Sequence, residues 1–221
     1  MIAELMRTVT RDGFAFLSAY MPDVSTATAL HGLSSVVQLD GFSEVQILRP
    51  RHLHESPPNT YSGNFGLDVF PFHTDLAHWY LPPRYVALRC VSGSSAVTTN
   101  LLCSSSLLQE FGTTSLHRTL LRPRRPMRGL KVLLRLLERG NDGLFRLRWD
   151  TLYLAPASEK STSLCMAIQG YLAAASPTKI ALSNAGDTLI IDNWRMFHAR
   201  SAVPSVFSER VIHRAYLGAL L

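Results

Sequence analysis

The sequence predicts a mainly β protein with flanking helices, built from two antiparallel sheets that pack on each other. Strand-like segments dominate both ends and the middle of the chain, with helices as packing between them. The chain shows no βαβ alternation with a glycine-rich phosphate loop and no internal repeat. An antiparallel double sheet protects its edges by packing sheet on sheet, so these patterns favour that class.

One domain spanning residues 1–221 is expected. The chain has 221 residues, of which 47% are hydrophobic, so it is long enough to bury one sizeable core. Charged residues make up 17%, which argues against disorder, and no linker divides the chain.

The N-terminal half begins with an expected helix over residues 2–10. A second helix is expected over 25–35, capped by Asp23 or Ser25. The segment 50–64 contains three prolines, a glycine and several polar residues, which predicts a loop long enough to be functional. Strands are expected at 14–17, 36–39, 45–48, 84–91 and 97–102.

In the C-terminal half, the serines 104–106 can cap a helix that extends to Phe111. Residues 144–154 alternate apolar and polar side chains with the two-residue period of a strand. A helix is expected over 158–174, and strands at 179–182, 188–192 and 211–217.

Positive charge is concentrated between residues 118 and 139, where eight basic residues face one acidic residue. We expect a helix–loop–helix there, with Pro123 and Pro126 in its middle. Such a stretch can bind nucleic acid, but no aromatic residues are interleaved for base stacking. A solvated surface is therefore the favoured interpretation.

The three cysteines, Cys90, Cys103 and Cys165, are odd in number and form no C-x-x-C pair. Neither a disulfide framework nor a zinc ribbon is indicated, which favours a reducing compartment. The N-terminal residues carry charges in place of an apolar signal, and no apolar run approaches the ~20 residues of a spanning helix. We expect a cytoplasmic protein without a membrane segment.

The most informative motif is His73-Thr74-Asp75. On an extended strand, residues two apart point to the same face, so this imidazole and carboxylate converge on one point. A second histidine from elsewhere would complete the two-histidine, one-carboxylate iron site of non-haem oxygenases.

The second candidate histidine is His198, which follows an apolar strand and the polar turn Asp192-Asn193. Beyond it come Arg210 and Arg214, which share one strand face. The guanidinium fork binds carboxylates through two hydrogen bonds, as a dicarboxylate co-substrate near an iron would require.

Together these segments resemble the taurine dioxygenase / clavaminate synthase-like (TauD/TfdA) superfamily of Fe(II)- and 2-oxoglutarate-dependent oxygenases. The first matching stretch contains His73-Thr74-Asp75 and Pro82-Pro83-Arg84-Tyr85. The second contains Gly186-Asp187, Asp192-Asn193-x-Arg195-x-x-His198 and Arg210. Together the two segments cover about a third of the chain. The resemblance implies a double-stranded β-helix, a cupin-like jelly roll. It implies that His73, Asp75 and His198 bind iron, that Arg210 and Thr99 hold 2-oxoglutarate, and that Arg214 holds an anionic substrate group.

The sequence departs from the family pattern in three places. Ala199 follows His198 where glycine is usual, Cys103 replaces a frequent Asp, and Ser95-Ala96 replaces a glycine pair. The last two weaken the alignment around Thr99, for which the neighbouring Thr98 is a substitute. His78, Trp79 and Asn64 are candidates for contact with the substrate, although the first two serve equally well as loop anchors.

The resemblance implies Fe(II), 2-oxoglutarate as co-substrate and O2, with release of succinate and CO2. The carboxylate of Asp75 weighs against halogenation, which needs an open position for chloride, and favours hydroxylation or a related desaturation or cyclisation. The expected substrate is a small, anionic molecule such as an amino acid or a natural-product intermediate.

Two alternative functions remain. One is an AlkB-type nucleic-acid demethylase, in which far fewer residues separate the H-x-D motif from the second histidine, and the other is a non-catalytic cupin-like metal-binding module. Membrane partners are not expected, and the oligomeric state is not readable from the sequence.

Overall fold

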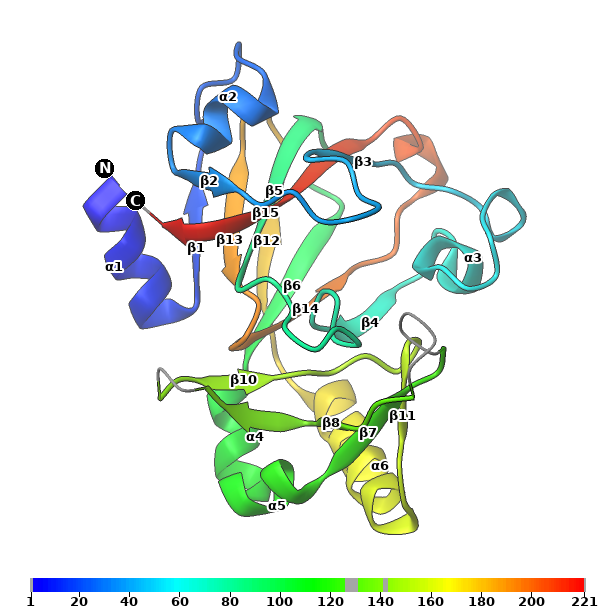
Figure 1. The fold of residues 1–221 in the computed structure, drawn as a ribbon. Helices are drawn as coiled ribbons and strands as arrows, with labels where there is room; N and C mark the ends of the chain where they lie inside the picture. Colours follow the sequence, from blue (N-terminus) through cyan, green and yellow to red (C-terminus); the bar gives the residue numbers. More distant parts are fainter. Residues whose placement is uncertain (1, 126–130, 141–142, 221) are drawn as a thin grey trace.

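The computed structural model describes residues 2–125, 131–140 and 143–220. Two antiparallel sheets form the upper part of the molecule in Figure 1, and a lobe of helices and short strands lies below them. The prediction of a mainly β protein with flanking helices is confirmed. Among the described residues, no helix combines the length and apolar character that a bilayer crossing requires.

The larger sheet has six strands, in the order β1-β13-β5-β15-β2, with β3 also pairing with β15. Strands β13 and β5 read as continuous apolar runs because both of their faces are covered. The bounds are β1 Phe14–Leu17, β2 Ser34–Val36, β3 Gln46–Leu48, β5 Tyr85–Ser92, β13 Thr188–Asp192 and β15 Val211–Leu220.

The smaller sheet has four strands, in the order β12-β6-β14-β4. Its strands are β4 Phe70–His73, β6 Thr98–Cys103, β12 Thr178–Ala181 and β14 Met196–Arg200. Side chains from both sheets meet in one core cluster between them, formed by Cys90, Leu101, Leu182, Leu189, Ile191, Met196 and Ile212. The inner faces of the two sheets therefore enclose the interior in which the histidines lie.

Two helices cover the outer face of the larger sheet. Helix α1 (Ile2–Asp12) buries Leu5 and Val9 against it, and α2 (Thr26–His31) contributes Leu30. The predicted cap of α2 is confirmed at Ser25, whose Oγ accepts a hydrogen bond from the Thr28 N–H at 3.2 Å. The expected loop at 50–64 contains the 3-10 turn η1 (Leu53–Glu55) and the start of α3 (Tyr61–Phe65), and a second such turn, η2 (Ser205–Phe207), precedes β15.

The lower lobe has its own apolar core, to which Leu107, Leu116, Ile168 and Leu172 contribute. Its helices are α4 Ser104–Phe111, α5 Thr113–Arg118 and α6 Glu159–Ala174. Its short strands form two small sheets, β11-β7-β8 and β10-β9. Their bounds are β7 Leu120–Pro123, β8 Leu134–Arg135, β9 Leu137–Arg139, β10 Phe145–Leu147 and β11 Leu154–Pro156.

The helix–loop–helix expected over the basic stretch is wrong, because this stretch contributes β7, β8 and β9. Leu121 and Leu134 pair across β7 and β8 and are buried, whereas Arg122 and Arg135 are exposed. The two-residue period of leucine and arginine thus decides the structure, since only strands send alternate side chains to opposite faces. Pro126 lies outside the described residues.

The strand expected over 144–154 is interrupted. Only 145–147 form β10, and β11 begins at Leu154. Between them the Asp150 carboxylate accepts the N–H groups of Leu152 and Tyr153, at 2.7 and 2.8 Å, and closes a turn. Arg148, expected on a solvated face, is 2% exposed and donates to the carbonyls of Ala77, Trp79 and Tyr80, so it anchors the loop that follows the histidine motif.

Candidate metal centre

Two neighbouring strands bring the histidines together. His73 ends β4, and His198 lies at the centre of β14, directly opposite His73 in the antiparallel pairing. Residues that face each other in such a pair lie on the same side of the sheet, and here that side is the interior. The two ring centroids are 4.4 Å apart, and the residues are 8% and 6% exposed.

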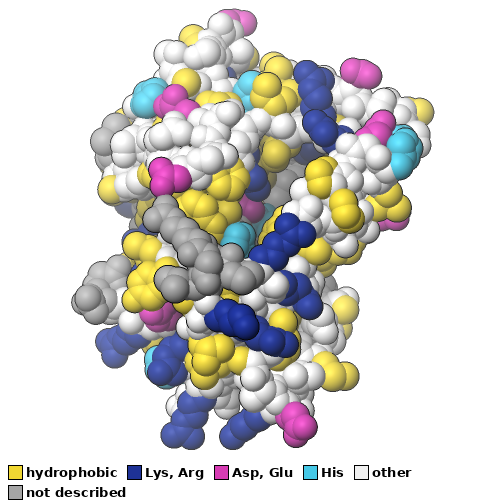
Figure 2. Space-filling model, turned by 45° about the vertical axis from the view of Figure 1, so that its right-hand side comes forward, with side chains coloured by type: hydrophobic (Ala, Val, Ile, Leu, Met, Phe, Trp, Pro, Cys, Tyr) yellow, Lys and Arg dark blue, Asp and Glu magenta, His cyan; other side chains and the backbone are white. Residues whose placement is uncertain are grey.

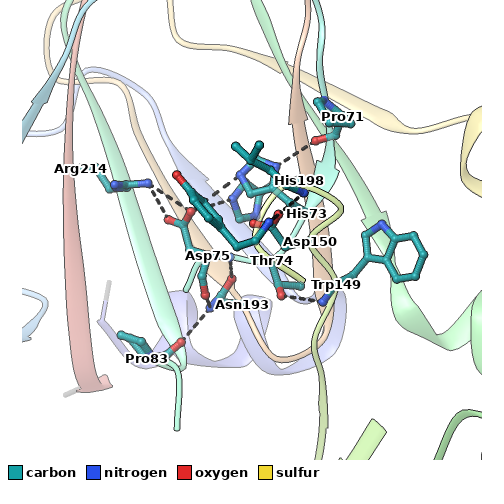
Figure 3. Close-up of polar contacts among 12 residues, drawn as sticks. Pro71, His73, Thr74, Asp75, Pro83, Trp149, Asp150, Asn193, His198 and Arg214 are labelled. Atoms are coloured by element: carbon teal, nitrogen blue, oxygen red, sulfur yellow. Dashed lines mark hydrogen bonds and ion pairs between the residues drawn. The ribbon is translucent and has the colours of Figure 1, made fainter. Parts of the chain in front are cut away.

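Asp75 joins them although β4 has already ended. The chain turns after His73, and Leu76 adopts a positive φ of 54°. The Asp75 Oδ1 atom lies 3.7 Å from His73 Nε2 and 3.6 Å from His198 Nε2. One ligand atom from each of the three residues lies within 4.8 Å of the others, and all three residues are buried (Figure 3).

The turn is held by Asn193, which lies between β13 and β14 and is 1% exposed. Its Oδ1 accepts the Asp75 N–H at 2.7 Å, and its Nδ2 donates to the Asp75 carbonyl at 3.0 Å and to the Pro83 carbonyl at 2.9 Å. This amide therefore fixes the backbone of the carboxylate relative to the strand that carries His198 (Figure 3).

The ring of His73 is oriented for metal binding. Its Nδ1 lies 2.9 Å from the Pro71 carbonyl, so a proton on Nδ1 leaves the Nε2 lone pair aimed at Asp75 and His198. Burial and the adjacent His198 lower the pKa of His73 to about 3. The imidazole is thus neutral near pH 7, the form that binds a metal.

The opposite sheet compensates the charge of Asp75. Arg214 Nη1 lies 3.1 Å from both carboxylate oxygens, and Tyr216 donates its hydroxyl to Oδ2 at 3.3 Å. Burial alone would raise the pKa of Asp75, but Arg214 and the two histidines outweigh burial and lower the pKa. The carboxylate is therefore ionised and ready to bind a cation.

Arg214 was expected to hold an anionic substrate group, and the structure places it on Asp75. Its remaining donors, Nε and Nη2, bind the Gln46 side-chain oxygen at 3.1 and 2.7 Å. A substrate that recruits this guanidinium must share it with Asp75.

Arg210 lies directly before β15 and is 9% exposed. Its Nε is buried without a hydrogen-bond partner, and no acidic side chain in the described ranges forms an ion pair with it. The half-buried Arg200 stacks on the Phe70 ring and donates to the carbonyls of Gly66 and Asp68, and burial and the charge on Arg210 lower the pKa of Arg200 to about 10. A buried guanidinium with a second positive group close by, and with no carboxylate ion pair among the described residues, forms a place for an anion.

Thr99 lies on β6, opposite Arg200 of β14, and is 6% exposed. Leu101, two residues on, lies opposite His198, so Thr99 shares the inner face with the histidine. Thr98, the substitute, points to the other face and donates its hydroxyl to Asn100.

The candidate substrate residues divide into two groups. His78 is half-buried with an unpartnered Nδ1, and its ring centroid lies 5.0 Å from that of Tyr153. Trp79 packs edge-on against Phe42 at 6.0 Å. Asn64 is exposed and uses its amide within its own loop, where it donates to the carbonyls of Pro58 and Thr60.

Two further residues lie beside the candidate metal centre, and of these sequence reasoning missed Asp150. Tyr61, at the start of α3, lies with its ring centroid 4.4 Å from that of His73. Asp150 follows Trp149, whose backbone bonds to Thr74 in both directions. No local pattern marks Asp150, because the contact joins segments 75 residues apart.

A cavity of about 490 Å³ lies away from this centre, between α1, β15 and the segment that begins at Pro82. It contains none of the three clustered residues. In Figure 2 the surface is also hollowed between the upper sheets and the lower lobe, and histidine, acidic and basic side chains are visible inside that hollow.

No protein-family model matches the sequence, and no curated protein sequence matches it significantly. The fold, in contrast, matches solved structures. Asparagine oxygenase in complex with Fe(II), (2S,3S)-3-hydroxyasparagine and succinate aligns with a TM-score of 0.72 and 18% identity, covering 98% of this chain and 77% of that chain. PvcB from Pseudomonas aeruginosa aligns with a TM-score of 0.68 and 17% identity, covering 100% and 82%.

The non-haem iron oxygenase OrfP, in complex with Fe, succinate and (3S)-hydroxy-L-Arg, aligns with a TM-score of 0.59 and 21% identity, covering 79% of this chain and 56% of that chain. A further PvcB structure is described as an Fe, α-ketoglutarate-dependent oxygenase. At identities this low the similarity establishes the fold, which this chain shares with these oxygenases.

Asn193→Ala tests the clamp on Asp75. Removing this amide leaves three buried backbone groups unpaired, so we expect a loss of about 3 kcal/mol in unfolding free energy. We also expect at least about tenfold weaker binding of divalent metal, because the carboxylate is no longer held. Urea unfolding and metal titration measure the two effects. The exposed Asn184→Ala is the control, and an unchanged metal affinity in Asn193→Ala would contradict the clamp.

Asp150→Asn tests the burial of the second carboxylate. Burial raises the pKa of Asp150 in the fold from its ordinary value of 3.8 to about 6. Because this carboxyl pKa is higher in the folded than in the unfolded protein, wild type loses stability as the pH rises from the unfolded pKa through the folded pKa. Relative to wild type, metal-free Asp150→Asn should therefore gain about 1 kcal/mol between about pH 5 and about pH 8. Chemical denaturation at both pH values measures the gain. If the difference in unfolding free energy between Asp150→Asn and wild type did not change with pH, the pKa of Asp150 would not be raised in the fold.

Proposed function

We propose that this protein is an Fe(II)- and 2-oxoglutarate-dependent dioxygenase that oxidises a C–H bond of a small molecule, by hydroxylation or a related reaction. The observation that carries the proposal is the buried cluster of His73, Asp75 and His198, with ligand atoms within 4.8 Å of one another. Two imidazoles and one carboxylate are the donor set that non-haem Fe(II) oxygenases use. The shared fold of asparagine oxygenase, PvcB and OrfP supports the same reaction class.

The three clustered residues would hold iron through His73 Nε2, His198 Nε2 and the Asp75 carboxylate. When bound, iron with 2-oxoglutarate activates O2, and the overall reaction converts R–H, 2-oxoglutarate and O2 into R–OH, succinate and CO2. The protein contributes orientation and exclusion of water, since each of the three residues is less than a tenth exposed. Arg214 and Tyr216 keep Asp75 ionised until the metal arrives.

Arg210 would bind the distal carboxylate of 2-oxoglutarate through a two-pronged ion pair, with Thr99 beside it on the inner face. The fit rests on a buried guanidinium whose Nε lacks a partner and on a neighbouring Arg200 that increases the positive potential. A dianion of this size supplies the negative charge that the described residues do not place there.

We infer a double-stranded β-helix for the two facing sheets and a single oxygenase domain over residues 1–221. The core cluster shared by the sheets supports both inferences. An amino acid is the favoured substrate class, because asparagine oxygenase and OrfP are described with hydroxylated amino acids. The AlkB-type and non-catalytic alternatives gain no support from these neighbours, and the cytoplasmic location stays a prediction.

Anaerobic titration with Fe(II) and 2-oxoglutarate tests the proposal. We expect a visible metal-to-ligand charge-transfer band in wild type, no band in Asp75→Ala or His198→Ala, and an unchanged band in the exposed control His54→Ala. Arg210→Met should retain Fe(II) and bind 2-oxoglutarate at least about tenfold more weakly, because a charge-assisted pair is lost. A band that survives Asp75→Ala would refute the ligand set, and unchanged 2-oxoglutarate affinity in Arg210→Met would refute the anchor.

A further inference from the structure

A second carboxylate, Asp150, is buried beside the candidate metal centre with no basic ion-pair partner among the described residues. It is 4% exposed, and its neighbour Trp149 accepts the Thr74 N–H and donates its own N–H to the Thr74 hydroxyl, where Thr74 is the residue between His73 and Asp75. Figure 3 shows Asp150 among the residues of the metal centre. The structure therefore holds two carboxylates in one region, and only Asp75 has an arginine.

No basic side chain among the described residues forms an ion pair with Asp150. Arg124, which shares a cavity with it, donates to the Thr151 carbonyl at 3.3 Å. Burial raises the pKa of Asp150 against the opposing effect of two backbone N–H groups, and the negative charge of Asp75 adds to the rise. An unpaired carboxylate in this position costs stability that a cationic ligand would restore.

The turn alone does not require a carboxylate at position 150. Only Oδ1 accepts the N–H groups of Leu152 and Tyr153, and an asparagine oxygen at this position would accept them equally well. The turn therefore uses one carboxylate oxygen, and the Tyr61 hydroxyl is a side-chain donor that lies near the carboxylate.

Aromatic groups surround the same place. The ring centroids of Tyr61 and Tyr153 are 5.9 Å apart, and the His78 ring lies 5.0 Å from Tyr153. The buried Tyr61 hydroxyl lies beside the Asp150 carboxylate, and the buried His78 Nδ1 has no hydrogen-bond partner among the described residues. Aromatic faces attract cations, and a carboxylate flanked by them is suited to a charged nitrogen with several N–H donors.

We propose that Asp150, Tyr61, Tyr153 and His78 form a subsite that binds a cationic nitrogen of the substrate, an ammonium or guanidinium group. The inference rests on the proposed oxygenase function for its placement beside the reacting centre. It adds a positive group to the small anionic substrate expected from the sequence, and so favours a zwitterionic or basic amino acid. An anionic group on the same molecule would meet Arg214.

Equilibrium binding to the metal-free protein tests the subsite with defined probes. L-Arginine, L-asparagine, agmatine and methylammonium each carry a cationic nitrogen, and N-acetyl-L-citrulline, which keeps the carboxylate and carries no cationic nitrogen, is the matched probe without a cation. N-acetyl-L-arginine and L-citrulline distinguish a guanidinium from an α-ammonium ligand, because each keeps only one of the two charges. Every cationic probe that binds to wild type is expected to bind to Asp150→Asn at least about tenfold more weakly. The exposed Asp23→Asn should bind them like wild type.

Three results would overturn the subsite: no binding by any cationic probe at millimolar concentration, equal affinity in Asp150→Asn, or binding of N-acetyl-L-citrulline as tight as that of L-arginine. Circular dichroism and thermal unfolding of Asp150→Asn verify that the turn is kept. The Fe(II)–2-oxoglutarate band, recorded on the same variant, separates the two proposals. A normal band with lost cation binding supports the subsite, whereas cation binding that depends on Asp150 in a protein without any band would leave the subsite standing and remove the oxygenase function.

Discussion

The buried carboxylate of Asp75 is the constraint on which the rest of the site depends. An ionised carboxylate that is 5% exposed persists only where opposite charge and hydrogen bonds replace water. The larger sheet supplies Arg214 and Tyr216, and the smaller sheet supplies the two imidazoles. Both sheets must therefore pack around this one group, and the same packing brings three side chains that could bind a metal to one point.

Around the candidate metal centre, positive charge is unpaired at one place and negative charge at another. The buried Arg210 and the half-buried Arg200 lie close to each other with no acidic ion-pair partner among the described residues, and Asp150 is buried there without a basic one. Buried unpaired charges of this kind are rare unless a ligand completes them. A dianionic co-substrate at the arginines and a cationic substrate group at Asp150 would complete both, and the metal centre lies in the region that holds them.

The sequence identified the parts of the site whose placement follows from local strand geometry. His73, His198 and Arg210 stand in short motifs whose side chains are directed by β4, β14 and the start of β15. Asp150 could not be predicted from the sequence because its position depends on a contact between distant segments. The helix–loop–helix expected for residues 118–139 was wrong because the alternating leucines of β7 and β8, and not the basic residues between them, determine the structure.

The central claim is that His73, Asp75 and His198 bind one iron ion with 2-oxoglutarate held by Arg210. Anaerobic crystals grown with Fe(II) and 2-oxoglutarate, measured at the iron absorption edge, test it most directly. We predict one anomalous peak between the two imidazoles and the Asp75 carboxylate, with the distal carboxylate of 2-oxoglutarate on the Arg210 guanidinium. Iron bound elsewhere, or 2-oxoglutarate bound away from Arg210, would contradict the claim.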